Sequence, residues 1–220
     1  VVVSPANGRM PPMTPAAQAR LRARMCNAQV GNFDGPERRP LGERCIMSFG
    51  SSAGPPMLPS LYNNNYAIIQ NAGEVLIQVE MVHDSRHIRL NAKHDAAGIP
   101  RWMGDSVGRW DGETLVIETV NLRPEQGLRG AGGATLKVTE RLTRISPNQI
   151  LYQFELNDPA TYTAPVKGEV AFNATKGPIY EYACHEGNYA LPGILAGARA
   201  EERAGREQEG ARGEVKEEGQ

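Results

Sequence analysis

The chain has 220 residues, with 24 lysines and arginines against 25 aspartates and glutamates, so its formal net charge is −1. This balance excludes the strongly basic surface expected of a general nucleic-acid binder, and we predict no nucleic-acid partner. The longest apolar run, EVLIQVEMV, is shorter than the roughly 20 residues of a membrane-spanning helix, which predicts no membrane span. The length is typical of one domain with attached ends. The chain starts at Val1 without a signal-peptide pattern, so we expect a mature or truncated form.

Residues 1–65 are expected to form an N-terminal helix followed by a long irregular segment. Thr14 is a good N-cap, Pro15 suits the first helical position, and the following AAQARLRARM consists mainly of strong helix formers. From Asn27 to Asn65 the chain is rich in Gly, Pro, Asn and Ser, as in GPERRPLGERC. We expect this stretch to be held by wrapping around the rest of the molecule.

Residues 66–189 are expected to form the body of the protein, built of short strands. Apolar and polar residues alternate in EVLIQVEMVH, and His83 continues the apolar face. The Asp111-Gly112 pair between two strand-like runs predicts a β-hairpin. Further short runs are RHIRL, TLKVTERLTRI, ILYQFELND, GEVAF and IYEYAC. These strands and their regular turns predict a mainly β protein with a single antiparallel, lipocalin-like β-barrel.

Residues 190–220 are expected to form a C-terminal helix and a mobile charged tail. Pro192 is well placed near a helix start, and the composition of LPGILAGARAEERAGREQE favours a helix. The last twenty residues contain no large apolar side chain apart from Val215. A charged stretch of this kind is usually a solvated surface.

The short motifs of many common enzyme classes are missing from the sequence. It contains no nucleophile elbow, phosphate loop, dinucleotide fingerprint or zinc-protease helix. The three cysteines, Cys26, Cys45 and Cys184, show no zinc-type spacing. We therefore predict no cofactor and no metal. These absences do not argue against an acid–base enzyme whose catalytic groups come from separate strands.

Three histidines lie close together in the sequence and raise a metal-site hypothesis. His83, His87 and His94 fall near Glu80 and Arg86, and imidazole nitrogens with a carboxylate form a common shell for divalent metals. The strand period separates Glu80 from His83, however. We therefore favour hydrogen-bonded polar residues at the end of a strand.

A second cluster consists of Trp102, Asp105, Ser106, Arg109 and Trp110. One interpretation is a ligand pocket floored by the indole rings, in which Arg109 reaches an anionic or carbonyl group of the ligand. In the other interpretation, Arg109 stacks on a tryptophan to close one end of the barrel and pairs with Asp105. We favour this structural interpretation.

Glu140 falls on the predicted apolar face of TLKVTERLTRI. A carboxylate in an apolar cavity can have a shifted pKa and act as an acid or a base. A satisfied ion pair in the barrel interior, with Arg86 or Arg109 as the partner, fits the same pattern. We favour the ion pair.

Several short segments of the sequence resemble the sequence motifs of a protein family. PLGERC, EMVHDSRHIRL, RWMGDSVGRWDGETLVIETVNL, LYQFELNDPATYTAPV and IYEYACHEGNYAL, in this order, are similar to words in a large family of uncharacterised secreted bacterial proteins, abundant in acidobacteria and related soil bacteria. The resemblance runs from about Pro5 to Glu202. It implies a location outside the cytoplasm and supports the fold expectation, and it implies no particular activity. In an exported protein, Cys45 and Cys184 in the words ERC and YACHE are expected to form a disulfide, whereas separate thiols are the alternative.

From these patterns we expect a secreted or periplasmic barrel that binds a small, partly apolar molecule. The predicted lining consists of Trp102, Arg109, Glu140, Tyr152, His83 and Arg86. The first alternative is an acid–base enzyme, a lyase or hydrolase, with Glu140 or Glu186 as the base and His83 or His185 as its partner. The second alternative is a structural or assembly protein that forms a homo-oligomer through its N- and C-terminal arms.

Overall fold

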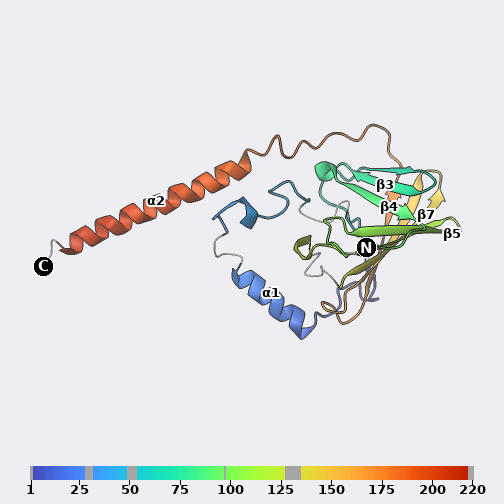
Figure 1. The fold of residues 1–220 in the computed structure, drawn as a ribbon, viewed down its shortest axis with the longest axis horizontal. Helices are drawn as coiled ribbons and strands as arrows, with labels where there is room; N and C mark the ends of the chain where they lie inside the picture. The colour runs from blue at the N-terminus through green and yellow to red at the C-terminus, as the bar shows by residue number, and fades with distance from the viewer. Residues whose placement is uncertain (1, 28–31, 49–53, 97, 127–134, 218–220) are drawn as a thin grey trace.

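The structure is a computed structural model, and it describes residues 2–27, 32–48, 54–96, 98–126 and 135–217. Within these ranges, nine strands form one sheet and two α-helices lie outside it (Figure 1). The helices are α1, Pro15–Asn27, and α2, Ala190–Glu217; short 3-10 helices cover Pro36–Arg38, Met81–His83 and Pro124–Gln126. The strands are β1 Val2–Ser4, β2 Tyr66–Gln70, β3 Glu74–Val79, β4 Ser85–Leu90, β5 Asp105–Asp111, β6 Thr114–Val120, β7 Lys137–Ser146, β8 Gln149–Asn157 and β9 Val166–Asn173.

The sheet has the strand order β1-β9-β8-β7-β6-β5-β4-β3-β2, so the protein is mainly β as predicted. β1 and β2 are its two edges, and no ladder between described residues joins them. Neighbouring strands are antiparallel except β4 and β5, which run parallel because residues 91–104 cross over instead of turning back. The prediction of a closed antiparallel, lipocalin-like barrel is therefore corrected to an open mixed sheet. Patterns of local alternation do not reveal such a crossover.

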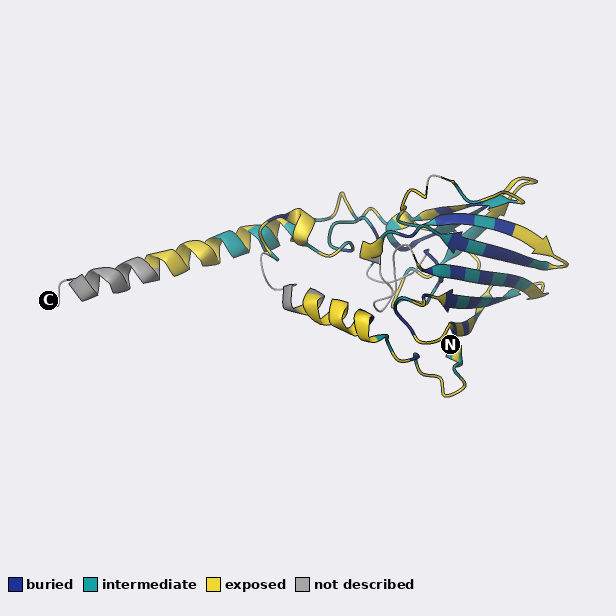
Figure 2. Ribbon diagram, turned by 60° about the horizontal axis from the view of Figure 1, so that its bottom comes forward, coloured by how far each residue is buried: buried dark blue, intermediate teal, exposed yellow. Residues whose placement is uncertain are grey.

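The sheet is strongly curved, and its concave face holds the core. Tyr66 of β2 and Phe172 of β9 stack with their ring centroids 5.3 Å apart, and Phe172 stacks on Tyr152 of β8 at 5.1 Å. Side chains from the two ends of the sheet therefore meet although these backbones do not pair. Figure 2 shows buried residues (dark blue) alternating with partly buried ones (teal) along the strands, as the period-two patterns predict. The buried core includes Val75, Ile77, Ile88, Leu115, Ile117, Val138, Leu142, Tyr152, Phe154, Leu156 and Val166.

The hairpin predicted at Asp111-Gly112 is confirmed. Asp111 at the end of β5 pairs with Thr114 at the start of β6, which leaves Gly112 and Glu113 as a two-residue loop. Gly112 has a φ of +59°, a conformation that glycine adopts without the penalty of a side chain.

The N-terminal segment is tied to the sheet at two places. Val2–Ser4 pairs with β9, so the first residues add an edge strand to the body of the protein. The N-cap predicted for α1 is present, because the Thr14 hydroxyl oxygen accepts a hydrogen bond from the Ala17 backbone N–H at 3.2 Å. The same hydroxyl donates to the Ala160 carbonyl at 3.0 Å, which fixes the start of α1 beside the chain that leads into β9.

The predicted C-terminal helix is present as α2, but the predicted last strand before it is wrong. Residues 174–189, which include the predicted strand IYEYAC, are irregular and form no ladder with the sheet. α2 then continues to Glu217, through most of the stretch assigned to a charged tail, and projects away from the sheet (Figure 1). Arg199 ties α2 to the wrapping segment by donating to the backbone carbonyls of Phe33 and Asp34. Among the described residues, neither helix combines the length and apolar character that a membrane crossing requires.

Candidate ligand-binding groove

A charged cluster lies in the interior of the curved sheet. Arg86 of β4 donates two hydrogen bonds to Glu140 of β7, at 3.2 Å to Oε1 and 2.6 Å to Oε2. Tyr152 donates to the same Oε1 at 2.7 Å, and its hydroxyl oxygen accepts from the Met57 backbone N–H at 2.8 Å. Arg86 is 1% exposed, and Glu140 and Tyr152 are 0% exposed. The favoured interpretation of Glu140, a buried ion pair with Arg86, is confirmed.

The strand register brings these groups together. Arg86 pairs with Ile77 on β3, and Glu140 lies between Ile117 on β6 and Phe154 on β8, so the charges sit in a row of inward-facing apolar residues. Burial and the neighbouring Glu140 carboxylate raise the pKa of Tyr152 well above its ordinary value. The Glu140 carboxylate is fully buried and bonded to Arg86 and Tyr152, so it is closed to a substrate.

The other residues of the predicted lining lie apart from this cluster. Trp102 stacks against Arg123, whose guanidinium carbon lies 4.4 Å from the ring centroid, so the predicted arginine–tryptophan stack exists with a different arginine. Arg109 is exposed on β5, and its Nη1 lies 3.9 Å from Glu118 Oε1. His83 is exposed with a φ of +56°, because β3 ends at Val79 before the histidine is reached. Its predicted place on the inner face of the strand is wrong.

The remaining catalytic candidates are exposed in the irregular segment after β9. His185 and Glu186 lie in a turn, and neither forms a hydrogen bond or ion pair through its side chain with a described residue. Glu140 and His83 form no hydrogen bond or ion pair with His185, with Glu186 or with each other. Among the described residues, no group of three or more His, Cys, Asp or Glu side chains is arranged to hold a metal ion.

Asp105 is part of a different network from the one predicted. It is 2% exposed and accepts hydrogen bonds from Arg89 at 2.6 Å, from His94 Nδ1 at 3.1 Å and from the Asp95 backbone N–H at 2.7 Å. Burial acts to raise the pKa of the Asp105 carboxyl, but these hydrogen bonds together outweigh it and hold the pKa below its ordinary value. Asp105 therefore anchors the crossover between β4 and β5, and the predicted pairing with Arg109 is wrong.

A groove of about 1000 Å³ lies at the end of the sheet where the β5–β6 and β7–β8 hairpins turn. Its floor consists of inward-facing apolar side chains that continue the core. Trp110 stands at its rim and is 48% exposed, an unusual state for the largest apolar side chain. The aromatic and apolar lining includes Tyr66, Ile68, Trp110, Leu115, Leu142, Ile150, Val170, Phe172 and Ile179.

Carboxamides dominate the polar part of the groove. Only Glu113 and Arg144 are charged among the described lining residues, and their charges are opposite. Gln149 Nε2 donates to Asn173 Oδ1 at 2.8 Å, which leaves Gln149 Oε1 and Asn173 Nδ2 without partners among described residues. The seven carboxamide residues are Asn64, Asn65, Gln70, Gln78, Asn148, Gln149 and Asn173.

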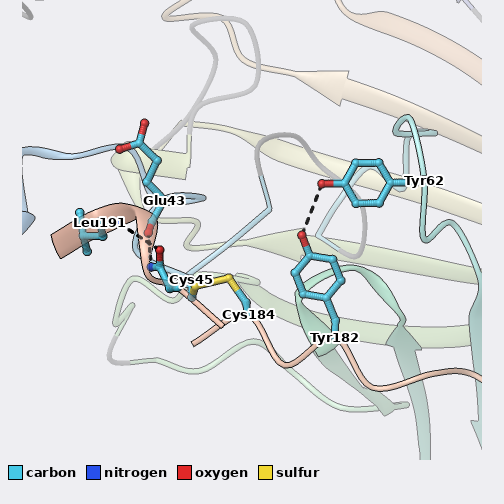
Figure 3. Close-up of a disulfide and its surroundings, with 7 residues drawn as sticks. Glu43, Cys45, Tyr62, Tyr182, Cys184 and Leu191 are labelled. Carbon is cyan, nitrogen blue, oxygen red and sulfur yellow. Dashed lines mark hydrogen bonds between the residues drawn. A yellow bond between two sulfur atoms is a disulfide. The ribbon is translucent and has the colours of Figure 1, made fainter. Parts of the chain in front are cut away.

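The predicted disulfide closes a separate seam. Cys45 and Cys184 are joined, with their Cα atoms 5.7 Å apart, and the bond ties the wrapping segment to the irregular segment before α2 (Figure 3). Asn188 donates from Nδ2 to the Glu43 carbonyl at 2.7 Å, which adds a second tie beside the disulfide. A smaller hollow of about 450 Å³ lies beside the disulfide.

Sequence patterns missed the groove because turns and strand ends supply much of its lining. Gln70, Glu113, Asn148 and Asn173 come from four different turns or strand ends, and only the curvature of the sheet brings them to one hollow. Trp110 was part of the predicted indole pocket and does line the groove, facing the core side of the sheet just before the Asp-Gly turn, but its predicted partners Trp102 and Arg109 do not line it. No family model, curated protein or solved structure matches the chain.

Proposed function

We propose that this protein captures a small, partly apolar molecule outside the cytoplasm and that the groove at the hairpin ends of the sheet is the binding site. The observation that carries the proposal is Trp110, which is half exposed above an apolar hollow of about 1000 Å³. This volume lies at the upper end of ordinary ligand pockets, which are mostly apolar with a few polar groups that orient the ligand.

The disulfide supports a location of the protein in an oxidising compartment. Cys45 and Cys184 are bonded, and structural disulfides persist mainly in exported proteins. The resemblance to secreted bacterial proteins points to the same compartment.

Capture without turnover is favoured over acid–base catalysis by the state of the candidate groups. Glu140 is closed inside the sheet and bound to Arg86 and Tyr152, while His185 and Glu186 lie outside the groove lining. A general base must come within hydrogen-bond reach of the proton that it removes. Assembly through the arms stays a prediction.

The binding proposal is tested by titrating the protein with N-phenyl-1-naphthylamine, a neutral apolar dye whose fluorescence rises when it leaves water. Ile150→Arg places a charge on the groove floor, and we expect the dye to bind at least about tenfold more weakly. Ile145→Arg is the matched control, because Ile145 is exposed on the neighbouring strand β7 and does not line the groove. Trp110→Ala, at the half-exposed rim, serves as a second variant if Ile150→Arg fails to fold. Equal dye affinity in the wild type and in a folded groove variant would refute the site.

A further inference from the structure

We infer that the ligand of the groove is a neutral saccharide chain, which names the ligand class of the proposed site and so rests on the proposed function. A sugar ring combines a flat apolar face of C–H groups with a rim of hydroxyl groups. Each hydroxyl both donates and accepts a hydrogen bond, so a complementary site needs aromatic surface together with groups that do the same.

The charge of the groove favours an uncharged ligand. Glu113 and Arg144 are the two charged residues among its described lining, they have opposite signs, and both are exposed at the turns. Arg144 is also engaged with its own turn, since it donates to the carbonyls of Ser146 and Pro147. A ligand with a carboxylate or phosphate would find no buried cation in this lining.

The carboxamides provide the paired donors and acceptors that hydroxyl groups require. Three of them are engaged within the protein: Asn64 bonds to Ser60, Asn65 to Glu80 and Gln78 to His83. Gln70 and Asn148 have side-chain amides without partners among described residues. Gln149 and Asn173 hold each other through one hydrogen bond and present a free acceptor and a free donor side by side. Two neighbouring hydroxyls of one sugar ring match such a pair, because each can satisfy one of the free amide atoms.

Aromatic rings supply the other half of the site. Trp110 presents its indole at the rim, 48% exposed, and the stacked Tyr66 and Phe172 lie in the same lining. An exposed ring face packs against the C–H face of a sugar at a low entropic cost, because the indole is rigid. Several lining residues are exposed, so the groove is open to solvent and leaves room for further sugar rings of a chain to extend beyond it.

The test uses the full chain and four neutral hexaoses: cellohexaose, maltohexaose, xylohexaose and laminarihexaose. Isothermal titration and displacement of N-phenyl-1-naphthylamine are both measured. We expect at least one hexaose to bind and to displace the dye, and Trp110→Ala to weaken it about tenfold.

The amide pair is tested with variants that keep its volume. Gln149→Met combined with Asn173→Leu removes the amides, and we expect hexaose binding to weaken about tenfold, a larger loss than that of the apolar dye, which needs no amide hydrogen bonds. Gln153→Met is the matched control, because Gln153 contacts Glu169 on the same two strands outside the groove lining, and it should bind as the wild type does.

The outcomes separate the two proposals. Dye binding at the groove without binding of any hexaose up to about 10 mM overturns the saccharide inference and leaves the proposed function standing. Binding of hexagalacturonate in place of the neutral hexaoses also overturns the inference. Absence of groove-dependent binding by dye and hexaoses alike overturns both.

Discussion

Replacing Arg86 by Met is expected to lower the free energy of unfolding by about 3 to 5 kcal/mol. The Arg86 guanidinium donates two hydrogen bonds to the Glu140 carboxylate, which is 0% exposed. Loss of the guanidinium leaves this carboxylate charged and buried, and among the contacts described above only Tyr152 still donates a hydrogen bond to it. With a urea slope of about 2 kcal/mol/M, this cost moves the unfolding midpoint down by about 1.5 to 2.5 M.

Removing both charges should cost far less than removing one. In Arg86→Met combined with Glu140→Leu neither charge of this pair is left in the interior, and the remaining penalty of about 1 to 2 kcal/mol comes from the Tyr152 hydroxyl that loses its acceptor. The double-mutant cycle should therefore give a coupling of at least about 3 kcal/mol. Tyr152→Phe, which keeps both charges, is a milder variant should Arg86→Met fail to fold.

The assay is urea unfolding followed by circular dichroism, with Arg141→Met as the control. Arg141 is the neighbour of Glu140 on the opposite face, and its ion pair with Asp111 is exposed, so this change should cost less than about 1 kcal/mol. A cost below about 1 kcal/mol for Arg86→Met, or a double variant as unstable as the sum of the two single variants, would refute the reasoning.

Two further predictions concern the disulfide and a buried acid. Because Cys45 and Cys184 are 139 residues apart, replacing both by Ser should lower the free energy of unfolding by about 5 kcal/mol in the chain-entropy model. Urea unfolding of the oxidised wild type and of the variant measures this loss, and equal unfolding midpoints would contradict the prediction. Burial raises the pKa of Asp84 to about 7, and its Oδ2 has no hydrogen-bond partner among described residues. The folded state therefore favours the neutral acid, so the free energy of unfolding should fall as the pH rises from about 4 to about 7. Because Asp84 is partly exposed, we expect this fall in the free energy of unfolding to be about 1 to 2 kcal/mol, and Asp84→Asn should abolish it. If the free energy of unfolding depends on pH in the same way in the wild type and the variant, Asp84 does not titrate as proposed.

The candidate site illustrates where sequence reasoning succeeded and where it could not. The placement of Glu140 among apolar residues was readable from the alternation in β7, and Arg86 was one of its two predicted partners. Trp102, Arg109 and His83 were grouped with them by their residue types, and the structure separates them because β3 ends early and the chain crosses over after β4.

The sequence by itself determined the local elements, because these depend on neighbours a few residues apart. The period of two defined most strands and their buried faces, Asp111-Gly112 defined a hairpin, and Thr14 defined the start of α1. Only the tertiary structure decided that the sheet stays open, that β4 and β5 are parallel, and that Arg86 reaches Glu140 across the interior. These features depend on the curvature of the whole sheet and on the path of one crossover, which no local pattern records, and the groove exists only because that curvature gathers turns far apart in the chain.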